Sequence, residues 1–148
     1  MVYNTAIIGC GRIGSLFDAD RKRKIISSHC GAYTNHPKTK LISACDINLK
    51  KVLQCKNQWN IKSHYVDFRE MLHNEKIDIL SICTHIDSHE QIINAAVEYG
   101  IKSIFCEKPI SGSLKSAKKI VAQCEKHEIK LAVNHFRRWD DFFINLKM

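Results

Sequence analysis

Short apolar runs alternate along this chain with segments in which apolar residues recur every three or four positions. A short apolar run between turn residues is typical of a buried strand, and the wider spacing is typical of a helix with one buried face. The runs predict strands at residues 3–8, 41–46, 64–66, 77–83, 103–106 and 130–133. The wider spacing predicts helices at residues 13–17, 29–35, 48–57, 67–74, 88–100 and 113–124.

Capping residues mark the starts of three of these helices. Asn48 and Ser113 are N-cap candidates, and Ser88 forms a capping box with Gln91. Gly100 follows the last apolar residue of the fifth helix, as a C-terminal glycine does. We expect the last helix to carry one apolar face formed by Leu114, Ala117, Val121 and Cys124.

Strands and helices therefore alternate along the whole chain. This order favours an α/β fold with a doubly wound parallel sheet of six strands (a Rossmann fold) and helices on both faces. We expect this domain over residues 1–133, with residues 134–148 starting a connection to a further domain. In the strand order of dinucleotide-binding folds, the ligand lies where the first and fourth strands part at their carboxyl ends.

A glycine-rich turn, Gly9-Cys10-Gly11-Arg12-Ile13-Gly14, directly follows the first predicted strand. Gly9 permits a sharp turn, Gly11 lets the backbone approach a pyrophosphate, and Gly14 lets the next helix pack closely on the strand. The backbone N–H groups at the start of that helix, with Arg12 and Ile13, would hold the phosphates. The motif alone also fits an ordinary strand–turn–helix, so its meaning depends on the rest of the chain.

An insertion separates this motif from the next strand. Asp18, Asp20 and the basic run at 21–24 interrupt the apolar spacing after Phe17, so we interpret residues 18–28 as exposed. Asp46 ends the second strand, where a dinucleotide site needs a carboxylate for the ribose hydroxyls. The insertion explains why Asp46 follows the glycines by more than the usual ~20 residues.

Composition narrows the class of protein. The chain of 148 residues is 45% hydrophobic and 26% charged, which is ordinary for one globular domain. No apolar run approaches the ~18 residues of a membrane span, and the first residues do not resemble a signal peptide, so we expect a cytoplasmic protein. Seven cysteines at irregular spacing predict buried, reduced thiols. His85 and His89 straddle a turn rather than share a helix, so no metal site is expected.

The formal net charge of +8 raises nucleic acid as a partner. Much of this charge comes from scattered lysines, however, and no basic helix carries interleaved aromatic residues. A solvated basic surface that attracts an anionic cofactor or substrate is the favoured interpretation. A basic nucleic-acid-binding domain is the less favoured alternative.

Polar residues follow the last three predicted strands. They are the segment 83–89, the tripeptide Glu107-Lys108-Pro109 and the segment 134–139. With these motifs in this order, residues 3 to about 142 resemble the N-terminal domain of the glucose-fructose oxidoreductase/inositol dehydrogenase/rhizopine catabolism (Gfo/Idh/MocA) oxidoreductases. Glu107-Lys108-Pro109 is the most specific marker, supported by Thr84 and by residues 134–139.

The resemblance implies NAD(P)-dependent hydride transfer between a nicotinamide cofactor and a sugar- or cyclitol-type hydroxyl or the corresponding ketone. In such enzymes the lysine that Lys108 matches lies near the nicotinamide and the substrate, so Lys108 is the candidate catalytic and cofactor-contacting residue. A cation there also stabilises a developing alkoxide. Glu107 would position Lys108 or contact a ribose, and Pro109 would follow a cis peptide bond.

The resemblance implies further cofactor contacts at Thr84, His85, His89 and Arg137. Relatives commonly carry proline directly after the threonine, so His85 departs from the family pattern. His89 fits equally well as a packing residue at a helix start, and one of Arg137 and Arg138 fits as a surface charge.

The expected cofactor is NAD, with NADP as the alternative. Ile47 follows Asp46 at the position where an arginine would favour NADP. Lys50 and Lys51 lie close behind in the sequence and keep NADP open.

The resemblance also implies a second, C-terminal α/β domain. In the family that domain supplies the remaining acid/base residues, most contacts to the small sugar-like substrate, and the subunit interface of a homo-oligomer. These 148 residues do not contain it, and residues 140–148 predict only the start of a helix leading onward. We therefore expect a cofactor site with weak or no activity alone, and a non-catalytic nucleotide-binding module is the alternative.

Overall fold

The computed structural model describes residues 1–20, 22–138 and 140–146 and contains one six-stranded parallel sheet. The strands are β1 (Tyr3–Ile8), β2 (Thr39–Cys45), β3 (Ser63–Tyr65), β4 (Ile79–Ile82), β5 (Ser103–Glu107) and β6 (Lys130–Asn134). They lie in the order β3-β2-β1-β4-β5-β6, and every neighbouring pair is parallel. The predicted doubly wound sheet is confirmed, with β1 and β4 side by side at its centre.

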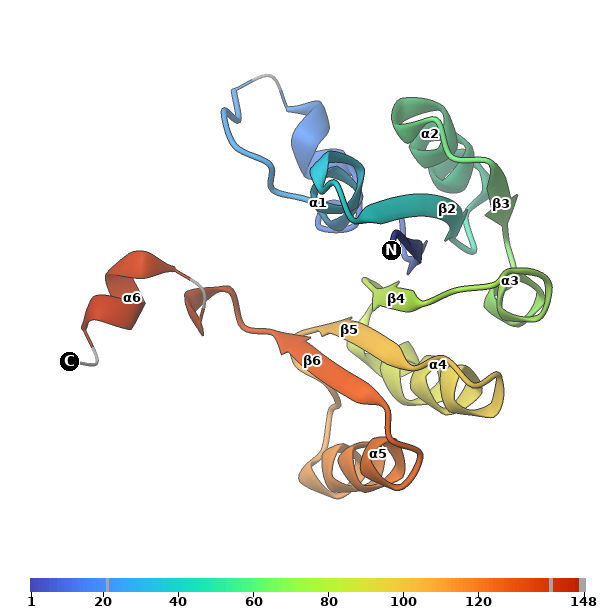
Figure 1. Cartoon of the computed structure of the whole chain (residues 1–148), viewed down its shortest axis with the longest axis vertical. Helices are drawn as coiled ribbons and strands as arrows, with labels where there is room; N and C mark the ends of the chain where they lie inside the picture. The colour runs from blue at the N-terminus through green and yellow to red at the C-terminus, as the bar shows by residue number, and fades with distance from the viewer. Residues whose placement is uncertain (21, 139, 147–148) are drawn as a thin grey trace.

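Helices cover both faces of the sheet (Figure 1). On one face lie α1 (His29–Asn35) and α2 (Leu49–Trp59), and on the other lie α3 (Phe68–Asn74), α4 (Ile86–Glu98) and α5 (Leu114–Lys126). Asn48, Asp67 and Ser113 cap α2, α3 and α5, each side-chain oxygen accepting a hydrogen bond from a backbone N–H of the first turn.

Each face of the sheet has its own apolar core. Met71, Ile93 and Ile120 are among the side chains buried beneath α3, α4 and α5. Ile7 and Val52 are buried on the face of α1 and α2, together with the thiols of Cys10, Cys30 and Cys55. All seven cysteines are buried and free, as the sequence predicts.

The start of α4 differs from the prediction. The helix begins at Ile86 with His85 as its N-cap, so Ser88 lies inside the first turn and does not form a capping box. The Ser88 hydroxyl instead lies 2.7 Å from Thr84 Oγ1 and 2.8 Å from the carbonyl oxygen of His85, to which it can donate. The loop between β4 and α4 is therefore shorter than the sequence pattern indicates.

The buried face of α5 also differs from the prediction. Ile120 and Cys124 are buried, whereas Leu114 and Val121 are 72% and 42% exposed. One residue turns an α-helix by about 100°, so Val121 cannot share the face of Ile120. The packing of α5 on α4 and β6 selects the face of Ile120, and apolar spacing alone could not make that choice.

The predicted helix after the glycine motif forms only one turn. The N–H of Ser15 donates to the carbonyl of Gly11 at 2.9 Å, and the chain then passes into a 3₁₀ helix, η1 (Leu16–Ala19). The prediction of a continuous helix over 13–17 is therefore wrong. Residues 19, 20 and 22–26 of the following insertion are exposed as predicted, and residue 21 lies outside the described residues. The prediction is wrong at the base of the insertion, where Asp18 and Ser27 are half-buried and Ser28 is buried.

Helix α1 resumes the turn that the insertion interrupts. Its first N–H groups, those of His29 and Cys30, donate to the carbonyls of Ile13 and Gly14 at 3.1 and 2.9 Å. In a continuous helix these two carbonyls would instead accept from the N–H groups of residues 17 and 18, four residues further along the chain. The insertion therefore loops out of a helix that begins at the glycines and continues as α1.

Asp18 closes the insertion at its base. Its carboxylate accepts hydrogen bonds from the backbone N–H groups of Ser27 and Ser28 and from the Ser28 hydroxyl. The ring of Phe17 is contacted by the guanidinium groups of Arg12 and Arg23, 5.0 and 4.2 Å from its centroid. These contacts hold the basic insertion next to the glycine turn.

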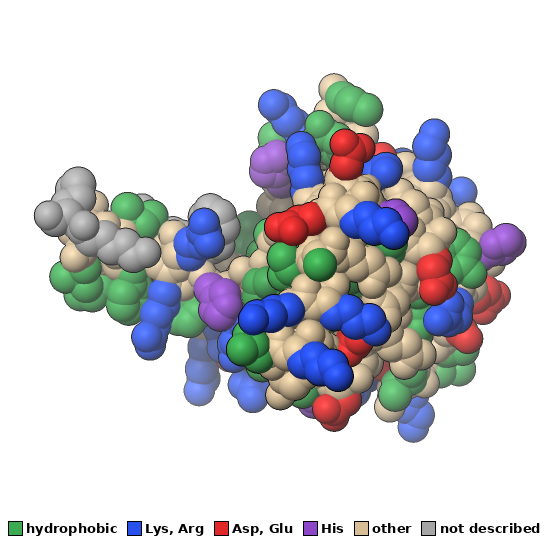
Figure 2. Space-filling view, turned by 90° about the horizontal axis from the view of Figure 1, so that it is seen from below, with side chains coloured by type: hydrophobic (Ala, Val, Ile, Leu, Met, Phe, Trp, Pro, Cys, Tyr) green, Lys and Arg blue, Asp and Glu red, His purple; other side chains and the backbone are tan. Residues whose placement is uncertain are grey.

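The C-terminal segment leaves the body of the molecule as an arm (Figures 1 and 2). It contains a 3₁₀ helix, η2 (Phe136–Arg138), and α6 (Asp141–Asn145), which is the helix expected after residue 140. Trp139 and residues 147–148 lie outside the described residues. Phe142 and Leu146 are each 66% exposed on this arm. In the part of the chain that the structure describes, no helix is long and apolar enough to cross a membrane.

Candidate active site

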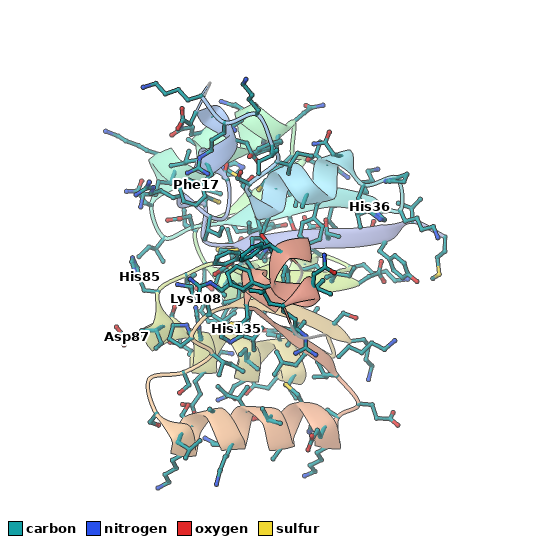
Figure 3. All side chains as sticks on the ribbon, turned by 90° about the vertical axis from the view of Figure 1, so that its left-hand side faces the viewer. Phe17, His36, His85, Asp87, Lys108 and His135 are labelled. Atoms are coloured by element: carbon teal, nitrogen blue, oxygen red, sulfur yellow. The ribbon has the colours of Figure 1, made fainter. Side chains whose placement is uncertain are left out.

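The carboxyl ends of the strands open onto one edge of the sheet, where the chemistry-bearing loops meet. Figure 3 shows His85, Asp87, Lys108 and His135 at this edge, and His36 at the opposite edge. The first four of these residues come from the loop after β4, the start of α4, and the segments after β5 and β6. In a parallel sheet all these loops converge, which makes this edge the candidate site.

The glycine turn has little room for side chains at its two ends. Gly9 has a φ of +98°, and a Cβ there would lie 2.6 Å from the carbonyl of Cys83. A Cβ on Gly14 would collide with the carbonyl oxygen of Gly9. At Gly11, in contrast, a Cβ would meet nothing within 4 Å. The first and last glycines are therefore needed for packing, while the middle one leaves the outer surface of the turn open.

The open surface of the turn carries free hydrogen-bond donors. Among the described residues, no protein group accepts a hydrogen bond from the backbone N–H groups of residues 11 to 14. These four N–H groups are the ones that the first turn of a helix leaves without a partner, and they form a ready anion site. The donors and the open space at Gly11 fit a dinucleotide pyrophosphate.

Asp46 follows β2, as predicted, and joins the glycine turn. Its Oδ2 atom accepts a hydrogen bond from the N–H of Cys10 at 2.9 Å, and its Oδ1 atom accepts one from the N–H of Asn48 at 2.9 Å. Each carboxylate oxygen can accept a second hydrogen bond, so the group can still receive a ribose hydroxyl. This contact stays a prediction.

His89 connects the loops after β4 and β5. The ring is 1% exposed, and its Nδ1 and Nε2 atoms lie 3.0 and 3.1 Å from the carbonyl oxygens of Pro109 and Thr84. Both nitrogen atoms therefore face protein carbonyls, which agrees with the packing alternative. His85 is exposed on the same loop, and the cofactor contacts expected of Thr84, His85 and His89 stay predictions.

Lys108 and Glu107 point in different directions at the end of β5. Lys108 is exposed at the strand edge, and the Lys108–Pro109 peptide bond is cis, as the resemblance implies. Glu107 is only 8% exposed. Its Oε1 atom lies 3.0 Å from His29 Nε2 and 2.6 Å from Asn134 Nδ2, both of which donate to it.

The environment of Glu107 favours its charged form. Burial acts to raise the pKa of the Glu107 carboxyl, but the hydrogen bonds from His29 and Asn134 and the electrostatic attraction to His29 lower it below 4.5 overall. The carboxylate is thus ionised at neutral pH and holds α1 and the end of β6 to the loop that carries Lys108.

The sequence interpretation missed the residues that support Glu107. His29 Nδ1 lies 2.9 Å from the hydroxyl of Ser81, which lies 2.7 Å from that of Tyr33. Ser81 is fully buried in β4, where the surrounding pattern predicts only apolar side chains. A hydroxyl inside an apolar run is the one sequence signal that points to a buried polar partner.

Arg12 and Arg137, two of the residues expected to contact the cofactor, each pack against aromatic rings. The guanidinium of Arg137 lies 5.0 Å from the ring centroid of Phe143 and 5.8 Å from that of Phe136, on the C-terminal arm. Arg12 is exposed beside the glycine turn, over Phe17. Within the described residues, no group of three or more His, Cys, Asp or Glu side chains is placed to hold a metal ion.

The family model described as an oxidoreductase family with an NAD-binding Rossmann fold matches residues 3–135. The chain belongs to the Gfo/Idh/MocA family. The Glu107-Lys108-Pro109 tripeptide, which led to this prediction, lies within the matched range.

Three comparisons show how the chain relates to individual proteins. It is 34% identical over 143 residues to the uncharacterized oxidoreductase YrbE of Bacillus subtilis, covering 97% of this chain and 38% of that protein. It is 26% identical over 137 residues to D-apiose dehydrogenase of Paraburkholderia graminis, covering 93% of this chain and 33% of that protein. The same fold occurs in scyllo-inositol dehydrogenase of Lactobacillus casei, whose structure was solved with bound NAD(H) and scyllo-inositol. The TM-score is 0.84 at 22% identity, and the match covers 99% of this chain and 40% of that protein. The chain thus spans between a third and two fifths of the length of these proteins.

The Glu107 contacts predict how stability changes in acid. Because the pKa of Glu107 is lowered in the folded chain, its contribution to the free energy of unfolding is complete above pH 4.5. That contribution is lost as the pH falls through the pKa of the folded chain. Glu107→Gln should lower the free energy of unfolding by about 1–2 kcal/mol at pH 7. It should also flatten the loss of stability below pH 4.5 in urea titrations.

Glu98→Gln is the matched control, because Glu98 pairs with Arg69 at 3.2 Å on the exposed surface. Its stability curve should follow that of the wild type. An equal acid dependence in wild type and Glu107→Gln would show that the buried contacts do not form in solution.

Proposed function

We propose that this chain is the cofactor-binding half of an NAD-dependent dehydrogenase that acts on a sugar- or cyclitol-type hydroxyl or ketone. The observation that carries the proposal is the glycine turn, with its unpartnered N–H groups and open space at Gly11, at the same sheet edge as Lys108. Residues 1–133 would form the cofactor domain, and residues 134–148 would lead towards a further domain.

The two halves of the cofactor would lie on either side of the glycine turn. In folds with this strand order, the adenosine ribose lies at the end of β2 and the other half crosses towards β4. Asp46 would accept hydrogen bonds from the adenosine ribose and repel a 2′-phosphate, which supports NAD over NADP. The nicotinamide half would reach the loops that carry Thr84 and Lys108.

Lys108 would act on the reacting oxygen of the substrate. The nicotinamide, when bound, supplies or accepts the hydride. The Lys108 ammonium is exposed at the strand edge and would stabilise negative charge on the substrate oxygen as its proton leaves or arrives. The sugar or cyclitol class is supported by the names of the apiose and scyllo-inositol dehydrogenases that the chain resembles.

A non-catalytic nucleotide-binding module is the second candidate. Both candidates require cofactor binding and differ only in turnover.

Gly11 offers the sharpest test of cofactor binding. A Cβ there would meet nothing within 4 Å, and a larger side chain would enter the space assigned to the pyrophosphate. Gly11→Val should keep the thermal unfolding midpoint close to that of the wild type and lower NADH affinity by about 100-fold in fluorescence titrations. Gly112→Ala, whose added Cβ would lie 3.9 Å from its nearest neighbour, is the control and should bind NADH normally. Absence of NADH and NADPH binding by the wild type would refute the proposal.

Asp46 tests the choice of cofactor. Removing its carboxylate in Asp46→Ala deletes the expected ribose acceptor, so NADH affinity should fall about tenfold while NADPH affinity falls less or rises. Asp78→Ala, at the opposite end of the sheet where Asp78 accepts from the N–H of Asn4, is the control. Unchanged selectivity in Asp46→Ala would mean that Asp46 does not contact the ribose.

Turnover separates the two candidates. Because a second domain supplies most substrate contacts in the family, these 148 residues should show little or no NAD⁺ reduction with a panel of sugars and cyclitols. The parent protein, if its reading frame continues, should reduce NAD⁺ with at least one of them, and Lys108→Ala should abolish that activity. An extended protein that binds NAD⁺ but turns over no substrate would favour the non-catalytic module.

A further inference from the structure

A chain of buried polar side chains runs beneath the candidate site. Tyr33, Ser81, His29 and Glu107 are joined in this order by contacts of 2.7, 2.9 and 3.0 Å, and Asn134 donates to Glu107 at 2.6 Å. His29 is 6% exposed, Ser81 0% and Glu107 8%. This row of hydrogen-bonded side chains crosses from α1 through β4 to the ends of β5 and β6.

The Glu107 carboxylate fixes the direction of the central hydrogen bond. An ionised carboxylate only accepts, so His29 Nε2 carries a proton and donates to it. The hydroxyls of Ser81 and Tyr33 can each donate or accept, so they satisfy His29 Nδ1 whether or not it carries a proton. The contacts that join Tyr33, Ser81, His29 and Glu107 can thus all be hydrogen bonds.

His29 is the residue at which the two halves of the site meet. Its backbone N–H donates to the carbonyl of Ile13 in the glycine turn at 3.1 Å, and its side chain holds Glu107. Glu107 directly precedes Lys108 and its cis peptide bond to Pro109. A displacement of His29 would therefore move the glycine turn through the backbone and the Lys108 loop through the side chain.

The stability of the fold alone does not explain why polar side chains occupy these buried positions. Burying a carboxylate and an imidazole costs free energy that an apolar pair of similar volume would avoid. The ring of Phe105 already packs against His29, with centroids 4.9 Å apart, so an apolar side chain could fill the same space. The polar contacts instead give the end of β5 one defined orientation.

We infer that His29 is a positioning residue of this site, because it orients Glu107 and the Lys108 loop towards the nicotinamide half of a dinucleotide. The inference rests on the proposed cofactor site and assigns His29 no contact with cofactor or substrate. It predicts that the side chain of His29 matters for ligands that reach the loop after β5 and not for ligands that occupy only the glycine turn and Asp46.

A comparison of NADH with ADP tests this distinction, because ADP lacks the nicotinamide riboside. His29→Ala should weaken NADH binding about five- to tenfold and change ADP binding less than about twofold, since one charge-assisted hydrogen bond is lost on the nicotinamide side only. His29→Gln retains a side-chain N–H donor and should recover most of the NADH affinity. Both ligands are titrated by calorimetry against the whole chain.

Two further variants keep the test independent of misfolding. Tyr33→Phe removes only the hydroxyl that contacts Ser81, at the end of the polar row farthest from Glu107. It should also weaken NADH binding, but by a smaller factor than His29→Ala. His127→Gln, at an exposed histidine after α5, should leave both affinities unchanged. If His29→Ala does not fold, the Gln and Phe variants still give the comparison.

The outcomes separate this inference from the proposed function. Selective loss of NADH binding with recovery in His29→Gln supports the positioning role. Equal losses of NADH and ADP, or wild-type binding of both, would overturn that role and leave the cofactor site in place. A wild-type chain that binds neither ligand would overturn both.

Discussion

The contact between the backbone at Gly14 and the carbonyl of Gly9 is the constraint on which the rest of the site depends. A Cβ at Gly14 would collide with that carbonyl oxygen, and a Cβ at Gly9 would collide with the backbone of Cys83, directly after β4. This close approach brings the first helical turn against the end of β1, and among the described residues the N–H groups of that turn have no protein acceptor. The space at Gly11 then lies where parallel strands bring their following loops together.

The same helical turn shows how the fold accommodates a long insertion. The carbonyls of Ile13 and Gly14 receive the N–H groups of His29 and Cys30, so the hydrogen-bond pattern of one helix continues across two segments distant in sequence. Helix α1 therefore begins, in physical terms, at the glycines. Its dipole would add to the field at the candidate anion site although the chain leaves and returns in between.

Glu107 and Lys108, which are neighbours at the end of β5, differ in burial. Glu107 points inward and is held by His29 and Asn134, whereas Lys108 points outward at the open edge. The inward carboxylate ties three elements together at one oxygen atom, and the outward ammonium is thereby attached to a firmly held backbone. The tripeptide Glu107-Lys108-Pro109 thus combines a structural anchor and a chemical group.

The sequence by itself determined the alternation of strands and helices, the sheet order, the glycine turn, the position of Asp46 and the family. These features are encoded locally, by apolar spacing, glycines and short motifs. Only the tertiary structure decided that the first helix is split, that α5 buries Ile120 rather than Val121, and that His89 faces two carbonyls. It also revealed the partnership of His29 with Glu107, because hydrogen bonds between residues 78 positions apart leave no periodic trace in the chain.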